Sequence, residues 1–586
     1  MDTVPFVSSA TRYLRDPAAV LVIAGFTSLV SQRWTGFNSP DSEFYASLAL
    51  FGSDVTDRAI EPAYTWTRLG YIVPVRLLTA AFGPWVGFEI WRIALIVMIV
   101  AAVYAVVSIA GRSRVLAAGL ALAVSLNTVI LAFVGNTYLT GTILAALFAL
   151  AALAVSQLGS AAHRGNGPLG SPRWTTAAVS GAVAGWLLML NPYSLILGLG
   201  LWLAVRIVVL ARIPRERWSR LGIDVLAATW SFGVAVAGFL LAGRSVFPAL
   251  NWWQTYLEWN ERLDYTVFIG DATTWRRDTA LLVIVLALIA STVAVISHPR
   301  HRWAWAALAL STANILMTIV LMVVMPGPWL ETPTYVAKLW PAALLSLVLV
   351  FTSMSPGTKE GKSLHSWLVA VGTAALVPLL MWSGRFDGVL SYGQGVAIAV
   401  VTAAVVITAL LVTRKYWNTW VAVVVIAAIG ATFVAAQFLQ NGRGLLGIYG
   451  QYPFRSAFVD FRYRDQMATK IAIQEWLLQR SARDDSVALW TDPQRLAADA
   501  AAMQLWGGYN IFTTQATLDR TTTARLEEIR PSVIAMYSPD REQITSLYKS
   551  LPPWALPSDL ECTSEPYLGV GTGEIVVCLT RLTWVG

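Results

Sequence analysis

Residues 86–110, VGFEIWRIALIVMIVAAVYAVVSIA, form one long apolar run. A helix needs about 20 predominantly apolar residues to cross the hydrocarbon core of a bilayer, and this run is longer than that. Its two charged residues, Glu89 and Arg92, lie near its start. They are three positions apart, which indicates a structural pair on one face of the helix. The stretch therefore predicts a membrane-spanning helix.

Twelve further apolar runs of near-spanning length bring the predicted total to about thirteen. They are residues 17–34, 115–135, 138–157, 174–191, 193–211, 223–246, 279–297, 304–325, 339–354, 366–383, 391–413 and 418–437. Charged residues make up 13% of the chain, against about 25% in an average soluble protein. We therefore predict a polytopic α-helical membrane protein. The net charge of +8 includes no dense basic run, so no nucleic-acid partner is expected.

Lys and Arg recur in alternate loops, which predicts the topology. These residues include Arg12 and Arg15, Arg112 and Arg114, Arg212 to Arg220, Arg300 and Arg302, Lys359 and Lys362, and Arg414 and Lys415. Short basic loops are typical of the cytoplasmic side. We expect a multi-pass protein of the cell membrane with a cytoplasmic N-terminus and an outer C-terminus. All four histidines then face the cytoplasm, which argues against an external Ser–His–Asp or His-bound zinc site.

The chain changes character after residue 440. We predict a transmembrane domain over residues 1–440 and an extracytoplasmic α/β accessory domain over residues 441–586. Its expected strands are 486–490, 509–513 and 532–537, and its expected helices are 466–480, 493–503, 518–529 and 541–550. Residues 561–582 read as a hairpin that places Cys562 and Cys578 on its two arms. A disulfide between them is favoured in an oxidising compartment.

The first external loop, about residues 33–85, opens with Asn38-Ser39-Pro40-Asp41-Ser42-Glu43-Phe44-Tyr45-Ala46. Asp41 and Tyr45 are four apart, so they share a face if the segment is helical. Such a helix would lie along the membrane surface. A structural alternative for Asp41 is a helix cap.

The predicted architecture resembles the GT-C superfamily of integral membrane glycosyltransferases. The shared features are a first helix, a long external loop with an acidic opening and an interfacial helix, many further spans, and an outer C-terminal domain. Similar members are the protein mannosyltransferases, the aminoarabinose transferases, and the actinobacterial envelope arabinosyl- and mannosyltransferases. Asp41 and Tyr45 match the first and last positions of the family's acidic motif. Ser42 departs from it, because many relatives carry a second acid there, and Glu43 follows one place later. Both Asp41 and Glu43 therefore remain candidates for the catalytic base.

The resemblance implies an inverting transfer of a sugar, most simply a pentose or mannose, from a polyprenyl-phosphate donor. The acceptor would be an envelope polysaccharide, glycolipid or protein on the outer face. The base would take the proton of the acceptor hydroxyl. A transporter, flippase or ligase for lipid-linked sugars is the alternative, although the predicted spans carry few charges near their centres.

A lipid-phosphate leaving group requires positive charge at the membrane surface. The candidates for binding it are Arg68, Arg76 and Lys338, with Tyr335 beside the last; Arg262, Arg276 and Arg277 are weaker. Contacts to lipid headgroups or to Glu61 are the alternative for the arginines, and snorkelling is the alternative for Lys338.

Candidate substrate-binding residues lie in two external loops. They are Tyr45, Glu61 and Tyr64 in the first loop and Trp253, Glu258 and Glu261 in a later aromatic one. An interfacial aromatic belt is the alternative for the tryptophan. Carboxylates alone are suited to Mg²⁺, Mn²⁺ or Ca²⁺. We expect no obligatory cofactor or metal.

Overall fold

A computed structural model of the chain places most of its elements. The structure describes residues 6–30, 40–58, 64–110, 114–127, 130, 133–134, 139–162, 173–211, 219–248, 250–262, 279–324, 337–354, 461–491, 510–513, 520–538, 540–569 and 572–585.

The larger part of the described chain is a helical bundle. Its helices are α1 (Phe6–Val30), α5 (Pro84–Ile109), α6 (Arg114–Ser125), α8 (Leu139–Ala162), α9 (Arg173–Leu190), α10 (Pro192–Leu210), α11 (Ser219–Val246), α13 (Thr279–Ser297), α14 (Arg302–Val324) and α16 (Trp340–Met354). Among the described residues, five helices are long and apolar enough to cross a membrane. The chain is thus a multi-pass membrane protein, as its composition predicts.

A helix lies at each of the first ten predicted spans, with one correction. Residues 115–135 are not a single helix, because α6 ends at Ser125. The amide nitrogen of Asn127 donates to the carbonyl oxygen of Val124, which tightens the chain into a turn at this polar residue. The predicted spans 366–383, 391–413 and 418–437 lie outside the described residues.

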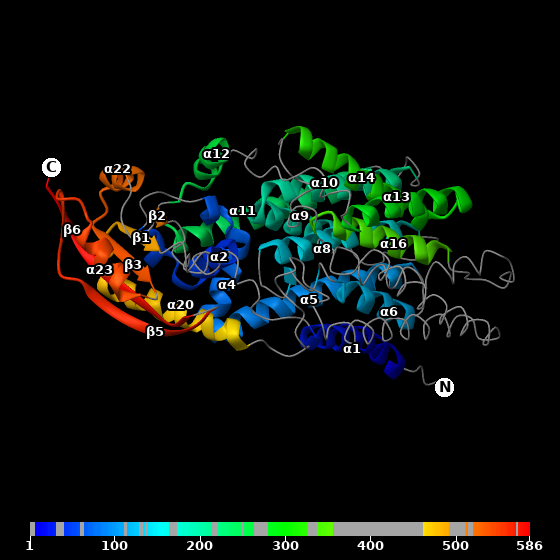
Figure 1. The fold of residues 1–586 in the computed structure, drawn as a ribbon. Helices are drawn as coiled ribbons and strands as arrows, with labels where there is room; N and C mark the ends of the chain where they lie inside the picture. Colours follow the sequence, from blue (N-terminus) through cyan, green and yellow to red (C-terminus); the bar gives the residue numbers. More distant parts are fainter. Residues whose placement is uncertain are drawn as a thin grey trace.

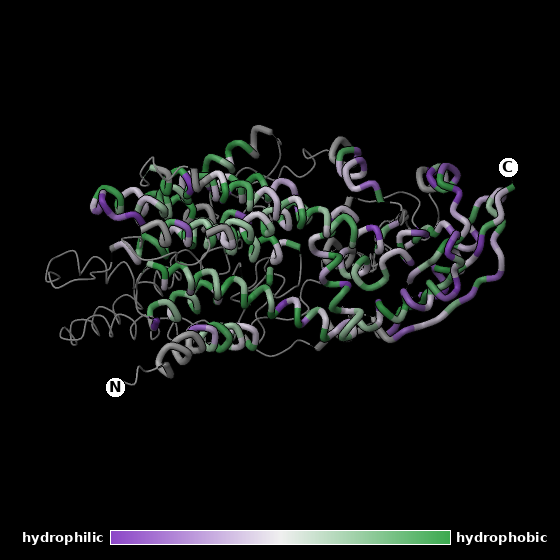
Figure 2. The backbone as a smooth tube through the Cα atoms, turned by 180° about the vertical axis from the view of Figure 1, so that it is seen from behind, coloured by the Kyte–Doolittle hydropathy of each residue, from purple (hydrophilic) through white to green (hydrophobic). Residues whose placement is uncertain are grey.

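Helix α8 forms the centre of the bundle and packs against α5, α9, α10 and α16. Its sequence is apolar on all sides, which is typical of a helix enclosed by other helices. Gly141 lets α8 approach the preceding segment closely, since an added Cβ would lie 2.4 Å from the carbonyl oxygen of Phe133. Figure 2 shows that hydrophobic residues predominate along the bundle and that hydrophilic residues are more frequent in the C-terminal part.

The first loop is built mainly of helices, namely α2 (Pro40–Phe51), α3 (Ser53–Thr56), the 3₁₀ turn η2 (Tyr64–Thr67) and α4 (Leu69–Phe82). Helix α2 is the predicted interfacial helix. Helix α4 was not predicted from the sequence, where residues 33–85 were assigned to an external loop. Arg68 is its N-cap residue, and Pro74 and Arg76 lie within it. Leu69, Tyr71, Ile72, Val73 and Val75 are buried in the structure. Their burial against the bundle stabilises a helix that local sequence signals do not favour.

The C-terminal part is a mixed sheet with helices on both faces. Its strands are β1 (Val487–Thr491), β2 (Asn510–Thr513), β3 (Val533–Ser538), β4 (Ala555–Pro557), β5 (Glu561–Gly569) and β6 (Thr572–Trp584). Strands β2, β1 and β3 run parallel, β6 pairs antiparallel with β3, and β4 and β5 both pair with β6. The helices are α20 (Phe461–Arg480), α22 (Arg520–Ile529) and α23 (Arg541–Lys549). The predicted helix at 493–503 lies outside the described residues.

Alternate strand residues divide between the two faces, as the two-residue period of a strand requires. Helices α22 and α23 cover the face that includes Trp490 and Ile534. Helix α20 covers the other face, which includes Leu489 and Ala535, and Val55 of the first loop packs into the same cluster. The first loop thus contributes a residue to the core of the C-terminal sheet.

Cys562 and Cys578 form a disulfide between the arms of the β5–β6 hairpin. The two residues are direct partners in the register, with their Cα atoms 4.1 Å apart. The disulfide crosslinks the outer strand β5 to β6. Strand β6 in turn pairs with β3, which belongs to the parallel part of the sheet.

The elements are arranged along one axis (Figure 1). The N-terminus lies at one end of the bundle and the C-terminal sheet lies beyond the other, with α2 and α4 between sheet and bundle. The first loop and the C-terminal sheet therefore share one end of the molecule.

Candidate functional site

Arg68 lies where the first loop meets the bundle. It follows η2 and caps the N-terminus of α4, with its amide donating to the carbonyl oxygen of Thr65 and its own carbonyl accepting from Ile72. Its side chain is 7% exposed. The guanidinium carbon lies 6.0 Å from the centre of the Tyr256 ring, in the range of a cation–π contact. The position of Arg68 at the start of α4 therefore places its positive charge inside the protein.

Lys338 lies two residues before the start of α16 and is 6% exposed. The segment is fixed from α14, because the side-chain amide of Asn314 donates a 3.0 Å hydrogen bond to the carbonyl oxygen of Leu339. Burial, and to a smaller extent the positive charge of Arg68, lower the pKa of the Lys338 ammonium from 10.5 to about 7. Two cations from distant parts of the chain therefore lie within electrostatic reach of each other.

Helix α12 (Trp252–Arg262) forms the aromatic wall of this site. The indole Nε1 of Trp252 donates a 2.7 Å hydrogen bond to the carbonyl oxygen of Thr67, the residue before Arg68. The Trp252 ring stacks on the Tyr256 ring with their centroids 5.7 Å apart. The Tyr256 ring in turn contacts the ring of Tyr193 on α10, with a centroid separation of 6.4 Å. These contacts hold the ring that lies against Arg68.

The chemistry of this cluster favours an anion. Two buried positive charges at one place create a positive potential that attracts a negatively charged group. Arg68 offers a planar fork of donors, whereas Lys338 offers a compact charge. A phosphate group suits this combination, because its oxygens accept paired and single charge-assisted hydrogen bonds.

Helix α2 carries the predicted base. The helix begins at Pro40, a residue that favours the first helical position, so Asp41 lies within the first turn instead of preceding the helix as a cap. Asp41 and Tyr45 share a helix face, as the spacing predicts. The side chains of Asp41 and Glu43 lie outside the described parts of the chain. Tyr45 is 2% exposed and packs edge-on against Tyr71 at 5.9 Å, which gives it a role in the core.

Arg76 has a defined structural role in this region. Its Nη1 atom donates to the carbonyl oxygens of Leu50 and Ala49, at 3.1 and 3.4 Å, and so caps the C-terminus of α2. Gly52 lies directly under the guanidinium. These contacts connect α4 to α2, while a phosphate-binding role for Arg76 stays a prediction.

The remaining predicted residues are either exposed or lie outside the described part of the chain, and they add nothing to the description of Arg68 and Lys338, the cation pair. Trp253 is 59% exposed. Glu258 is also exposed and accepts a 2.7 Å hydrogen bond from Gln254 on the next turn of α12. Glu61, Tyr335, Arg276 and Arg277, and the side chains of Tyr64, Glu261 and Arg262, lie outside the described residues. Within the described part of the chain, no three His, Cys, Asp or Glu side chains lie together as a metal site would require.

Sequence reasoning missed the buried face of α12. Trp252 and Tyr256 are four residues apart and face inward, whereas the chosen Trp253 faces outward. The signal was the helical spacing of Trp252, Thr255 and Tyr256, which places all three on one face.

No protein-family model and no curated protein matches the chain. Similar solved structures include ArnT from Cupriavidus metallidurans in the apo state, at 14% identity and a TM-score of 0.49, covering 97% of this chain and 98% of that one. A structure of that ArnT with undecaprenyl phosphate gives 13% identity, a TM-score of 0.47 and the same coverage. The mycobacterial arabinofuranosyltransferase AftD gives 13% identity and a TM-score of 0.45, covering 98% of this chain and 40% of that one.

AftD is by name a sugar-transferring enzyme, the class that the sequence resembles. At TM-scores below 0.5 these likenesses assign neither an activity nor a site residue to the chain. The functional argument therefore starts from the geometry of Arg68 and Lys338.

Proposed function

We propose that the protein is an inverting glycosyltransferase that takes a sugar from a polyprenyl-phosphate donor. The supporting observation is that Arg68, at the start of α4 in the first loop, and Lys338 are both buried and lie close enough for the charge of Arg68 to lower the pKa of Lys338. In this proposal the sugar is a pentose or mannose. The acceptor is an envelope polysaccharide, glycolipid or protein.

The two cations would stabilise the departing phosphate. As the bond between the anomeric carbon and the phosphate oxygen breaks, negative charge grows on that oxygen. Arg68 is permanently charged and binds the phosphate before the reaction. Lys338, whose pKa is lowered to about 7, gains a proton more readily once an anion is bound beside it.

The base would come from the first turn of α2. Asp41 takes the proton of the acceptor hydroxyl as that oxygen bonds to the anomeric carbon and the lipid phosphate leaves with the bonding electrons. Glu43 is the alternative base, because it lies in the same turn. No obligatory metal is part of this proposal.

The membrane arrangement belongs to the same proposal. The transmembrane domain, residues 1–440, would carry the reaction, and residues 441–586 would lie outside the cytoplasm as an accessory domain. The shared position of the first loop and the sheet at one end of the bundle supports this orientation.

The test is transfer from a panel of polyprenyl-phosphate sugars by the purified full-length protein in detergent or nanodiscs. We expect loss of transfer in Asp41→Asn or Glu43→Gln and in Arg68→Met. Arg525→Gln is the control, since Arg525 pairs with Glu528 on the exposed surface of α22. Wild-type rates in both carboxylate variants would exclude the proposed base.

A transport assay separates the alternative function. The protein would be reconstituted in vesicles that carry a fluorescent lipid-linked sugar in one leaflet. Movement of that lipid without transfer would favour a flippase. Transfer without movement supports the proposed enzyme.

A further inference from the structure

The first loop is joined to the C-terminal sheet by a buried arginine, Arg58, which lies two residues after the end of α3. Its Nε atom donates to the hydroxyl of Ser481, and its Nη2 atom donates to the carbonyl oxygen of the same residue, both at 2.9 Å. Nη2 also reaches the carbonyl oxygen of Leu478 at 3.3 Å. The side chain is 6% exposed. Arg58 therefore binds the C-terminus of α20 from a loop more than 400 residues earlier in the chain.

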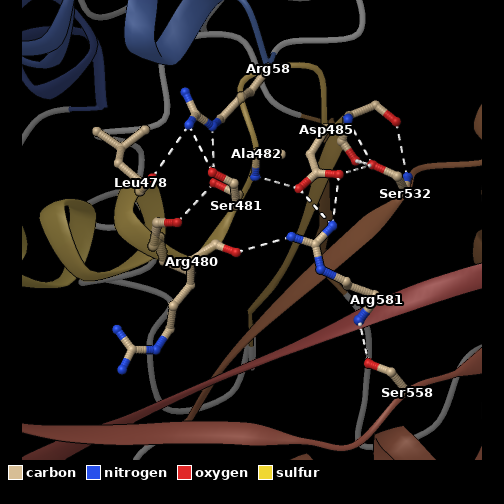
Figure 3. Close-up of polar contacts among 11 residues, drawn as sticks. Arg58, Leu478, Arg480, Ser481, Ala482, Asp485, Ser532, Ser558 and Arg581 are labelled. Carbon is tan, nitrogen blue, oxygen red and sulfur yellow. Dashed lines mark hydrogen bonds and ion pairs between the residues drawn. The ribbon is translucent and has the colours of Figure 1, made fainter.

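The acceptors of these bonds explain why an arginine is needed. The last carbonyl groups of a helix have no partner within the helix, and they form the negative end of its dipole. Arg58 satisfies two of these carbonyls with one planar group. Figure 3 shows its guanidinium at the turn that joins α20 to β1.

The same turn is tied to the sheet from the other direction. The Nη2 atom of Arg581 on β6 donates to the carbonyl oxygen of Arg480 at 3.1 Å, and its Nη1 atom pairs with Asp485 (Figure 3). Asp485 also accepts from the amide of Ala482 and the hydroxyl of Ser532. The turn that Arg58 binds is therefore itself held by β6 of the sheet through Arg581.

Backbone and apolar contacts complete the junction. The amide of Val487, the first residue of β1, donates a 3.2 Å hydrogen bond to the carbonyl oxygen of Arg58. Val55 is fully buried in one cluster with Leu477 and Leu489. An exposed ion pair between Asp57 and Arg483 lies at the edge of the junction.

The junction lies at the end of the helix that carries Asp41. Gly52 separates α2 from α3, and α2 is 12 residues long. At 1.5 Å per residue, Asp41 lies about 16 Å from Gly52, so a tilt of about 5° at Gly52 moves it by about 1.4 Å. A misplacement of about 1 Å costs about a hundredfold in rate for a positioned catalytic group.

We propose that Arg58 is a positioning residue, through which the C-terminal sheet fixes α2 and its carboxylates relative to the cation pair. This inference rests on the proposed function for its kinetic consequence but not for its structural one. It makes the C-terminal sheet a part of the catalytic apparatus in addition to any binding role.

The test compares Arg58→Gln, Arg58→Lys and Ser481→Ala with Arg483→Gln in the full-length protein. Hydrogen–deuterium exchange of peptides within residues 40–58 measures the order of the first loop. Steady-state transfer measures kcat and the KM for the donor. Arg483 is the matched control, because it joins the same two segments by an exposed ion pair.

We expect Arg58→Gln to raise exchange in the first loop and to lower kcat by about tenfold or more, with the donor KM changed less than about threefold. Arg58→Lys should show smaller changes in exchange and kcat than Arg58→Gln, since lysine keeps the positive charge but lacks the planar set of donors of a guanidinium. Ser481→Ala should also raise exchange and lower kcat, but by less than Arg58→Gln. If Arg58→Gln fails to fold, the result for Ser481→Ala decides whether the inference holds. Arg483→Gln should resemble the wild type.

Wild-type exchange and kcat in Arg58→Gln, or in Ser481→Ala where Arg58→Gln does not fold, would overturn the inference. An equal loss in Arg483→Gln would also overturn it, since the effect would then reflect general loosening. If the wild type transfers no sugar at all, the proposed function fails, and the exchange measurement still decides whether Arg58 orders the loop.

Discussion

The indole of Trp252 donates a hydrogen bond to the carbonyl oxygen of Thr67, with nitrogen and oxygen 2.7 Å apart. The acceptor immediately precedes Arg68 in the sequence, and the stacked Tyr256 ring lies against the guanidinium of Arg68. One helix, α12, thus supports both the backbone and the side chain of the proposed phosphate-binding arginine.

Trp252→Phe should weaken the binding of the donor. The variant keeps most of the aromatic surface but loses a neutral hydrogen bond, worth about 1 kcal/mol or roughly a fivefold rise in donor KM. The KM is measured by initial rates of transfer. Trp305→Phe is the control, because it loses a similar indole hydrogen bond, to the carbonyl oxygen of Pro299 at the turn between α13 and α14, and should leave the KM unchanged. Equal changes in the two variants would show that the hydrogen bond to Thr67 is unimportant.

Gly52→Ala should destabilise the protein through Arg76. Gly52 has a φ of 54°, and an added Cβ would lie 2.8 Å from the Arg76 Nη1 atom. Backbone strain of about 1–3 kcal/mol would be joined by loss of the Arg76 bonds to the end of α2, about 1 kcal/mol each. Apparent thermal midpoints report the change.

Gly83→Ala provides the matched control for this prediction. Gly83 also has a positive φ, of 78°, but an added Cβ meets nothing within 4 Å. In an Arg76→Met background, Gly52→Ala should cost less than in the wild type, whereas Gly83→Ala should cost the same in both. Additive effects of Gly52→Ala and Arg76→Met would contradict the coupling.

The membrane class and much of the C-terminal sheet could be predicted from sequence because they depend on local patterns. Apolar run length predicts α5, and alternation with turn residues predicts the β5–β6 hairpin. Helix α4 was missed because Pro74 and its flanking arginines hide a helix that tertiary burial stabilises. The cations Arg68 and Lys338 could be selected by residue type and side of the membrane. Their proximity depends on packing between segments far apart in the chain, which no local pattern encodes.

Removal of the disulfide should destabilise the C-terminal sheet. Cys562 and Cys578 are separated by 16 residues in sequence, and a crosslink closing a loop of that size contributes about 3 kcal/mol. The Cys562→Ser, Cys578→Ser double variant should unfold at a lower temperature, as should the wild type after reduction. Reductant should have no further effect on the double variant. An unchanged midpoint for the fully reduced wild type would show that strand pairing alone holds β5.

Donor binding should weaken as pH rises through neutrality because of Lys338. Its pKa is lowered from 10.5 to about 7, first by burial and then by Arg68. At a pH below this lowered pKa, Lys338 of the folded protein is a charged ammonium that attracts the donor phosphate. At a pH above it, Lys338 is a neutral amine and attracts the phosphate less. Between that value and 10.5 the unfolded chain binds more protons than the folded one, so stability should rise with pH as donor affinity falls.

Initial rates between about pH 6 and pH 9 with a polyprenyl-phosphate sugar would check this, since a phosphodiester keeps one negative charge over that interval. Donor KM should rise with pH in the wild type. It should be flatter in Lys338→Arg, whose guanidinium stays charged, and high at every pH in Lys338→Met. A similar dependence on pH in Lys338→Arg would place the titrating group elsewhere in the site.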